Sequence, residues 1–414
     1  FRGERNPPVF DWRFRHYIRA RNLVGVVQVP GLQVEILPKI DADTLDHGHL
    51  DQDGPAQRMA QSNLLFMLAQ AQRVRMVDVD LSSLRLQAMP LLDTLVSIFV
   101  DRLAAELKRG VDRGYVHEEA CLGVLRGKLD FSRQVRQQAV NAARFHVCYD
   151  EYILDTWMNR VLKAGCRVLG KTVSAAPIRR RLLELLNTLA SVTDVAGTPE
   201  QFQKIQWNRN NERMRPCVDF VRLIMANRAP APASGSSETF SLLFPMESLF
   251  EEFVARFIVR HASDLGLRRD RIRIQAAGSR PRLLRDEQQA GAFRLKPDVL
   301  ILDDVGSSAC AIDTKWKRLS SEDSNQGVTQ ADLYQLHAYA RRFDCPMNVL
   351  LYPTGRGLSE RSWTLDGEPS KRVDVRLMDL NFDFAANPHR LVEGFRRILG
   401  TTRSAPGRTA GYDA

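Results

Sequence analysis

The sequence predicts an α+β protein of several domains, with a small β-rich N-terminal head, a mostly helical middle and a C-terminal α/β unit. Three observations lead to this expectation. Apolar and polar residues alternate near the start of the chain, apolar residues recur at helical spacing through its middle, and two aliphatic runs flank a short Gly/Ser turn near its end. A chain of 414 residues has room for two or three such domains.

The composition is that of an ordinary globular protein, with 44% hydrophobic and 26% charged residues. Its six cysteines lie far apart without a C-x-x-C pair, which argues against a disulfide framework or a zinc ribbon and indicates a reducing, cytoplasmic environment. We find no signal peptide and no apolar run of about 18 residues, so we expect no contact with a membrane. The net charge of +10 suits a polyanionic partner such as DNA, although many basic proteins bind no nucleic acid.

Residues 1–55 predict the β-rich head, which is a candidate for contact with a partner protein. Six arginines lie among aromatic residues in 1–22, a composition suited either to phosphate or acidic-surface contact or to a solvated arm. Leu, Val and Ile alternate with polar residues over 32–36 after a Pro-Gly turn, and this alternation predicts a hairpin within 23–40. The hairpin is either a partner-binding element or simply a packed pair of strands.

Residues 56–228 predict the helical middle domain. Apolar side chains recur on one face near Leu64, and Pro90 opens a helix that Gly110 closes. The segment 117–131 looks extended. We expect three further helices within the ranges 150–169, 178–192 and 212–228.

A run of Ala, Pro and Ser at 229–238 predicts a linker and a domain boundary. The α/β unit follows at 239–400, opened by an amphipathic helix with apolar residues at i, i+3 and i+4 from Met246. The tail at 401–414 lacks core-forming residues, and we expect it to fray. The other elements predict helices around a mixed sheet: a hairpin over 295–319, a helix over 329–343, strands over 347–355 and 372–381, and a final helix over 388–399.

The hairpin carries acidic residues where aliphatic side chains would pack better. If its strands pair symmetrically about the turn between Val305 and Gly306, Asp298 lies opposite Asp313, with Cβ atoms about 4.5–5.5 Å apart. Lys315 returns to the same face two residues later. Two carboxylates so placed repel each other, so that either one of them holds a proton or a cation lies between them.

A divalent cation between the aspartates would remove the repulsion, and oxygen-only ligation favours Mg²⁺ or Mn²⁺ over zinc. The amphipathic helix offers Glu247 and Glu251 as a third carboxylate, of which we favour Glu251. Gln335 and Tyr339, four residues apart on the next helix, can reach this site or a DNA phosphate. These groups suit phosphodiester hydrolysis, in which Lys315 orients a water molecule or neutralises developing charge.

The alternative is an edge hairpin whose aspartates face water. An acid-x-Lys triplet carries little weight alone, since Glu106-x-Lys108 repeats the pattern at the end of a helix. The triplet Asp313-x-Lys315 differs in its setting, because it lies in an aliphatic strand between a Glu-bearing helix and a Gln/Tyr helix. Surface aspartates do not usually interrupt apolar runs on both partner strands.

Pro297-Asp298 and Asp313-Thr314-Lys315, followed by Gln335 and Tyr339, resemble the motifs of the PD-(D/E)xK nuclease superfamily. Over roughly residues 23–345 the chain also resembles the McrC family, the nuclease subunits of McrBC modification-dependent (type IV) restriction systems. The segments VEILPKI, LRGKLDF, CYDEYILDTWMNRVL and LFEEFV carry this second resemblance. It implies a restriction-endonuclease-like fold for 239–400. It also implies metal binding by Asp298, Asp313 and Glu251, and a catalytic role for these residues together with Lys315.

The resemblance further implies a partner. McrC-like subunits insert their N-terminal region into a ring of the AAA+ GTPase McrB, which recognises methylated cytosine. They stimulate GTP hydrolysis and cut DNA with their C-terminal domain. We therefore expect a Mg²⁺-dependent DNA endonuclease of an anti-phage defence complex, with any nucleotide bound by the partner and not by this chain. Two alternatives remain open: an NTPase-activating adaptor with a vestigial nuclease, and a stand-alone repair nuclease.

Overall fold

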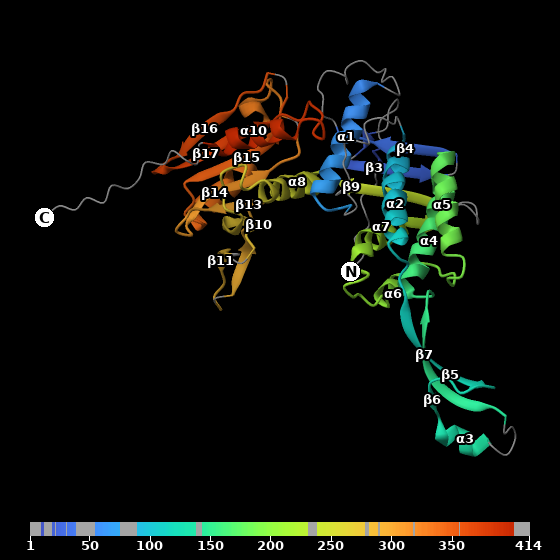
Figure 1. Ribbon diagram of the computed structural model, residues 1–414. Helices are drawn as coiled ribbons and strands as arrows, with labels where there is room; N and C mark the ends of the chain where they lie inside the picture. The colour runs from blue at the N-terminus through green and yellow to red at the C-terminus, as the bar shows by residue number, and fades with distance from the viewer. Residues whose placement is uncertain are drawn as a thin grey trace.

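The computed structural model describes residues 10–11, 19–20, 22–29, 31–38, 54–74, 89–137, 143–230, 238–277, 281–288, 290–317, 319–355 and 357–400. It is a mixed α+β protein with several sheets, as the sequence predicts. Figure 1 shows a body of helices around the N-terminal strands, a second body around the C-terminal sheet, and an arm that projects from the first body. The Arg-rich opening lies almost wholly outside the described residues, and the tail 401–414 lies outside them entirely.

The predicted N-terminal hairpin is confirmed as β3 (Leu23–Val29) and β4 (Leu32–Ile36), and the short pair β1 (Phe10–Asp11) and β2 (Arg19–Ala20) precedes it. The hairpin does not stand alone, however. Its sheet has the order β4-β3-β9-β8, in which β8 is Arg228–Pro230 and β9 is Glu238–Pro245.

This pairing differs from the expected division of the chain. The range 229–238, expected as a linker, includes residues of β8 and the first residue of β9. The rest of β9 falls in the range expected for the C-terminal unit, yet it pairs with β3. Gly25 permits the close approach of the two strands, because its φ is +133° and a Cβ there would lie 2.0 Å from the carbonyl oxygen of Leu242. The N-terminal and C-terminal segments therefore share one sheet.

The helices of the first body pack into one hydrophobic core. The helix expected within 150–169 is wrong in its first part, because 145–153 forms a strand and the helix begins only at Trp157. The Thr156 side chain caps that helix by accepting a hydrogen bond from the Asn159 backbone. These helices are α1 (Pro55–Gln70), α2 (Leu91–Lys108), α4 (Trp157–Thr172), α5 (Ala176–Thr188), α6 (Pro199–Gln203) and α7 (Arg215–Ala226).

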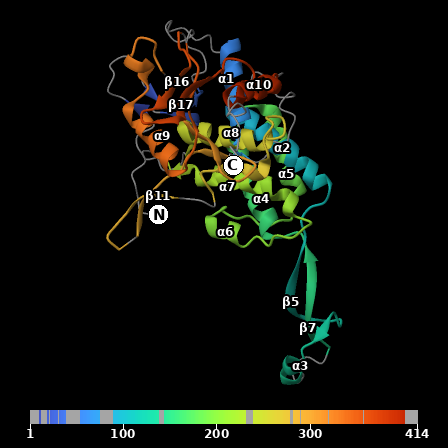
Figure 2. The same cartoon turned by 90° about the vertical axis from the view of Figure 1, so that its left-hand side faces the viewer.

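The arm comprises residues 114–153 and leaves the first body between α2 and α4 (Figures 1 and 2). It holds a three-stranded antiparallel sheet of order β5-β7-β6. Within 117–131 the expected extended conformation is confirmed at 117–122 and 128–129, whereas Phe131 begins a helix. Its elements are β5 (Gly114–Leu122), β6 (Lys128–Leu129), α3 (Phe131–Gln137) and β7 (Phe145–Ile153).

The C-terminal body is built around a six-stranded mixed sheet of order β10-β13-β14-β15-β17-β16. The pairs β14–β15 and β15–β17 are parallel, and the others are antiparallel. The elements are α8 (Met246–Arg260), β10 (Ile272–Ile274), the hairpin β11 (Arg282–Arg285) and β12 (Gly291–Arg294), β13 (Val299–Leu302), β14 (Ser308–Thr314), α9 (Gln330–Arg342), β15 (Met347–Pro353), β16 (Arg361–Leu365), β17 (Glu368–Met378) and α10 (Pro388–Leu399).

The two faces of this sheet bury different side chains. Residues such as Ile312 and Val349 face the large core that includes α8 and α10, whereas Ala311 and Leu350 face the smaller core with α9. Because side chains alternate along a strand, Asp313 lies on the same face as Ala311 and therefore beneath α9. The order of the strands thus brings an acidic side chain under the helix that carries Gln335.

Helix α1 joins the two bodies. The fully buried Asn63 donates hydrogen bonds to the carbonyl oxygens of Leu380 (3.3 Å) and Phe382 (2.8 Å), and its own oxygen accepts one from the Phe384 backbone (2.9 Å). The Phe66 ring packs edge-on against Phe384, with ring centroids 5.8 Å apart. In the part of the chain that the structure describes, no helix is both long enough and apolar enough to cross a membrane.

Candidate metal centre

The register of the β13–β14 hairpin places the two aspartates as the sequence predicts. Three pairs keep the expected pairing: Val299 with Ile312, Leu300 with Ala311, and Ile301 with Cys310. The register shifts by one residue beyond Ile301, so the turn itself is less symmetrical than expected. Continuing the regular pairing toward the other end of the hairpin sets Asp298, which directly precedes β13, opposite Asp313.

Asp298 is buried, with 8% of its surface exposed. Its Oδ2 accepts hydrogen bonds from both the backbone nitrogen and the Oγ1 of Thr314, each at 2.7 Å. Burial raises the pKa of Asp298 to about 7, and the negative charges of Asp313 and Glu251 add to the effect. The side chain is thus a carboxyl group that is reluctant to ionise in the absence of a nearby cation.

Asp313 is more deeply buried, at 2% exposure. Its Oδ1 accepts hydrogen bonds from Gln335 Nε2 (3.1 Å) and from the Tyr339 hydroxyl (3.4 Å), and its Oδ2 lies 2.6 Å from Lys315 Nζ. Burial raises the pKa of Asp313, although the positive charge of Lys315 opposes this shift. The aspartates of the hairpin therefore do not face bulk water.

Lys315 is half-buried, and Gln335 orients it. The ammonium group donates to Gln335 Oε1 at 3.0 Å, while the amide nitrogen of the same Gln335 donates to Asp313 and contacts the Tyr339 hydroxyl at 2.6 Å. Burial alone would lower the pKa of Lys315, but the nearby Asp313 carboxylate outweighs it and the pKa is raised. The lysine therefore keeps its positive charge.

Glu251 reaches the site from α8. Its Oε1 accepts a hydrogen bond from Gln275 Nε2 at 2.6 Å, and the backbone nitrogen of Gln275 donates to the carbonyl oxygen of Asp298 at 2.9 Å. Gln275 thereby links the helix acid to the hairpin acid. Its φ is +50°, a left-handed conformation that is uncommon outside glycine. The sequence analysis missed this residue, and a Gln after a three-residue strand gives no signal that could have identified it.

These side chains border one cavity of about 460 Å³. Asp298, Asp313, Lys315, Glu251 and Gln335 all line it, whereas Tyr339 contacts Asp313 from within the smaller core. The sequence analysis also missed other residues of the lining, among them Lys296, Lys317 and Asp332. Lys317 forms an ion pair with Asp332, to which Tyr352 donates a hydrogen bond at 3.1 Å.

The donor set fits a hard divalent cation. Five acidic side chains line the cavity, Glu247, Glu251, Asp298, Asp313 and Asp332, and Asp332 is paired with Lys317. The pKa of Asp298 is raised first by burial and then by the negative charges of Asp313 and Glu251, so these three carboxylates would gain most from a bound cation. Mg²⁺ and Mn²⁺ prefer oxygen ligands of this kind. Asp298, Asp313 and Glu251 are therefore the residues that could hold such an ion.

The expectation that this chain binds no nucleotide rests on the absence of a phosphate-binding loop, and one stretch requires a correction to it. Gly165–Thr172 reads GCRVLGKT and so matches the G-x-x-x-x-G-K-[ST] pattern of phosphate-binding loops. That motif acts as a loop between a strand and a helix, but here it lies entirely within α4, where helical hydrogen bonds occupy the backbone. Gly165 serves packing, since a Cβ there would lie 2.4 Å from Val221. That the partner binds any nucleotide stays a prediction.

A known protein family matches this chain over most of its length. The family model described as "McrBC 5-methylcytosine restriction system component" matches residues 18–353. The chain belongs to the McrBC family. Over 269 residues it is 20% identical to the type IV methyl-directed restriction enzyme EcoKMcrBC of Escherichia coli strain K12, covering 63% of this chain and 75% of that protein.

A chain in a solved McrBC assembly shares the fold. The refined half-complex from the tetradecameric assembly of Thermococcus gammatolerans McrB AAA+ hexamers with bound McrC contains a similar chain, with a TM-score of 0.70 and 22% identity. The match covers 93% of this chain and 83% of that one. The cryo-EM structure of the T. gammatolerans McrBC complex gives 27% identity and a TM-score of 0.49 over 59% and 68% of the two chains. The fold shared with the half-complex agrees with the family match.

Proposed function

We propose that this McrBC family member is the Mg²⁺-dependent DNA endonuclease subunit of a cytoplasmic modification-dependent restriction complex. One observation carries the proposal: Asp298, Asp313, Glu251 and Lys315 line one cavity beside the β13–β14 hairpin of a mixed sheet. The spacing Asp298 … Asp313-Thr314-Lys315 on adjacent strands supports a PD-(D/E)xK nuclease fold for the C-terminal body.

In this proposal Asp298, Asp313 and Glu251 hold the cation. When bound, Mg²⁺ would withdraw charge from the scissile phosphate and lower the pKa of a coordinated water. Lys315 orients the attacking water or neutralises the charge that develops on the phosphate. Gln335 fixes both Lys315 and Asp313 through its two amide ends, so that the lysine keeps its place beside the carboxylates.

Partner assembly is part of the same proposal. The similar T. gammatolerans structure is an assembly of McrB AAA+ hexamers with bound McrC, and we infer a ring-forming AAA+ GTPase partner here as well. The arm projects from the first body (Figure 2). It is a suitable contact element because it also exposes apolar side chains. Those exposed by 60–75% are Tyr115, Val124, Leu125, Phe131 and Val135. The β3–β4 hairpin and the Arg-rich opening, the earlier candidates, remain predictions.

The decisive experiment replaces one carboxylate in the full chain. Asp298→Ala should lower Mg²⁺-dependent DNA cleavage at least about 100-fold, because it removes a metal ligand. GTP hydrolysis by the partner should still be stimulated. The matched control is Asp304→Ala, an exposed aspartate at the tip of the same hairpin, which should cut normally.

The outcomes separate the candidate functions. Cleavage at the wild-type rate by Asp298→Ala would mean that this cavity is not the nuclease site. An adaptor with a vestigial nuclease predicts that the wild-type chain stimulates the GTPase and cuts no DNA. A stand-alone repair nuclease predicts cleavage that is independent of the ring. Truncation after residue 228 is a poor test of the adaptor function, because it removes β9 and all but the first residue of β8 from the N-terminal sheet.

A further inference from the structure

The arm carries a second group of metal-binding side chains, far from the carboxylate cavity. In the antiparallel pairing of β5 with β7, His117 lies opposite Asp150 and Glu119 lies opposite Cys148. Residues two apart on a strand share a face, so these four side chains lie on one face of the ribbon. One ligand atom each from His117, Glu119 and Cys148 lies within 4.8 Å of the others.

We propose that this face binds Zn²⁺ or a similar borderline divalent metal through His117, Glu119 and Cys148. Imidazole nitrogen, carboxylate oxygen and thiolate sulfur are the zinc ligands of proteins, with bonds of about 2.0–2.3 Å. The three ligand atoms lie within 4.8 Å of one another, so small side-chain movements are enough to bring them onto one ion. The carboxylate and the thiolate together balance the charge of the dication. Three protein ligands leave a fourth position for water or for a partner's side chain.

The neighbouring Asp150 carboxylate orients His117 for metal binding. His117 Nδ1 lies 3.0 Å from Asp150 Oδ1, and a carboxylate only accepts hydrogen bonds, so Nδ1 carries the proton. Nε2 is then the nitrogen that can bind a metal. Zinc-binding histidines almost always donate their other ring N–H to a group of this kind. Asp150 is thus a positioning residue.

Glu119 can bind a metal without losing its existing partner. Its Oε2 forms an ion pair with Arg133 of α3 at 2.5 Å, and a carboxylate has a second oxygen. Cys148 is a half-exposed free thiol on the same face. The opposite face of β7 has a structural role, because Arg126 stacks over the Tyr149 ring at 4.1 Å and pairs with Glu151.

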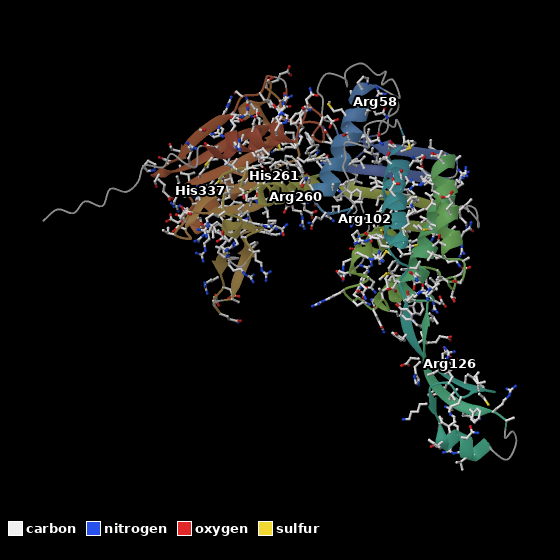
Figure 3. The ribbon with its side chains drawn as sticks, in the orientation of Figure 1. Arg58, Arg102, Arg126, Arg260, His261 and His337 are labelled. Carbon is white, nitrogen blue, oxygen red and sulfur yellow. The ribbon has the colours of Figure 1, made fainter. Side chains whose placement is uncertain are left out.

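The ligand chemistry distinguishes this site from the carboxylate cavity. Thiolate is a soft ligand that disfavours Mg²⁺, whereas the cavity offers oxygen alone. The two sites are also far apart in the molecule, as Figure 3 shows by the positions of Arg126 on the arm and His337 on α9. A metal at the arm would join β5 to β7 and stiffen the projecting ribbon, and it need not take part in DNA cleavage.

Co²⁺ substitution tests the proposal on the full chain. The protein carries Asp298→Ala and Asp313→Ala, so that the carboxylate cavity contributes no binding. Titration with Co²⁺ should give one ion per chain and a near-ultraviolet thiolate-to-metal charge-transfer band, and Zn²⁺ should displace the ion. Cys148→Ser should abolish the band. His117→Gln and Glu119→Gln should each weaken Co²⁺ binding at least about 10-fold, and Asp150→Asn should weaken it about 10–100-fold with the band retained.

The matched control is Cys121→Ser. Cys121 is an exposed cysteine on β5, the strand of His117 and Glu119, and it lies on the same face, opposite His146. It lies outside the group of three. This variant should keep the band and the affinity. No thiolate band in the parent protein, a band that survives Cys148→Ser, or a band lost in Cys121→Ser would each overturn the proposal. Far-ultraviolet circular dichroism confirms that every variant is folded.

Discussion

Gln335 and Asp313 are joined by a hydrogen bond of 3.1 Å from the amide nitrogen to Oδ1, and the amide oxygen of the same Gln335 accepts from Lys315. A single side chain on α9 thereby sets the spacing between the carboxylate and the ammonium group. An amide suits this task because it offers a donor at one end and an acceptor at the other.

Gln335→Leu keeps the volume and removes both ends of this link. We expect Mg²⁺-dependent cleavage to fall about 10–100-fold, as is typical when a group that orients a metal ligand is lost. Gln330→Leu is the control, since Gln330 lies exposed at the start of the same helix and contacts Tyr334. Equal cleavage rates for the two variants would contradict the role of Gln335.

The raised pKa of Asp298 predicts a pH-dependent stability. The proton is bound more tightly in the folded state, with a pKa of about 7, than in the unfolded state near 3.8. Ionisation of Asp298 therefore lowers the free energy of unfolding progressively as the pH rises from 3.8 to about 7, by on the order of 4 kcal/mol at most. Asp298→Asn can still accept the Thr314 hydrogen bonds, and we expect it to be more stable than wild type at pH 8 and nearly equal at pH 4. Thermal unfolding without divalent ions measures this, with the exposed Asp304→Asn as the control.

Divalent cations should reverse the loss of stability that ionised Asp298 causes. An ion that binds only the folded state stabilises it by about 2.7 kcal/mol at 100 times its dissociation constant. Mg²⁺ or Mn²⁺ should therefore raise the melting temperature of the wild-type chain at pH 8, and a chelator should remove the gain. Asp298→Asn should gain much less. An equal gain in both proteins would place the bound ion elsewhere.

Asn63 should matter for stability although it does not line the cavity. Asn63→Leu leaves buried backbone groups of Leu380, Phe382 and Phe384 without their partner. Each such group costs about 1–3 kcal/mol, so we expect the free energy of unfolding to fall by about 3 kcal/mol or more. Ser62→Ala is the neighbouring control, because its bond to Asp383 is long at 3.5 Å. Chemical denaturation distinguishes the two, and similar losses for both would contradict the role of Asn63.

The exposed tip of the arm should contribute to partner binding. Phe131 is 70% exposed, and Phe131→Ser removes apolar surface without disturbing the core. We expect weaker stimulation of the partner GTPase and unchanged unfolding. Leu183→Ser, an exposed position on α5, should have no effect. Stimulation by Phe131→Ser equal to that of wild type would exclude this residue from the interface.

The opposed positions of Asp298 and Asp313 could be predicted from the sequence, because the two strands of one hairpin are close in the sequence. The residues from 299 to 312 form one hairpin, and the shift near its tip leaves the regular pairs beside Asp298 unchanged. Periodicity likewise located α8 and α9, whose burial follows from their own apolar residues.

Other features depend on contacts that no local pattern encodes. Strand β9 pairs with β3 from more than 200 residues away, and its neighbouring Pro/Ala-rich stretch reads as a linker. Gln275 donates to Glu251 from a left-handed backbone conformation, and a Gln in a sequence does not predict that conformation. The strand at 145–153 pairs with both β5 and β6, and the helical periodicity of the residues after Trp157 does not reveal these contacts.

Strand β9 passes into helix α8 without an intervening loop, since Pro245 ends the one and Met246 begins the other. The strand is held in the N-terminal sheet by β3, and the helix carries Glu251 to the cavity. A rotation of the N-terminal sheet therefore turns the helix with it. We therefore expect a partner that rotates the first body to displace Glu251 as well, because no loop separates β9 from α8.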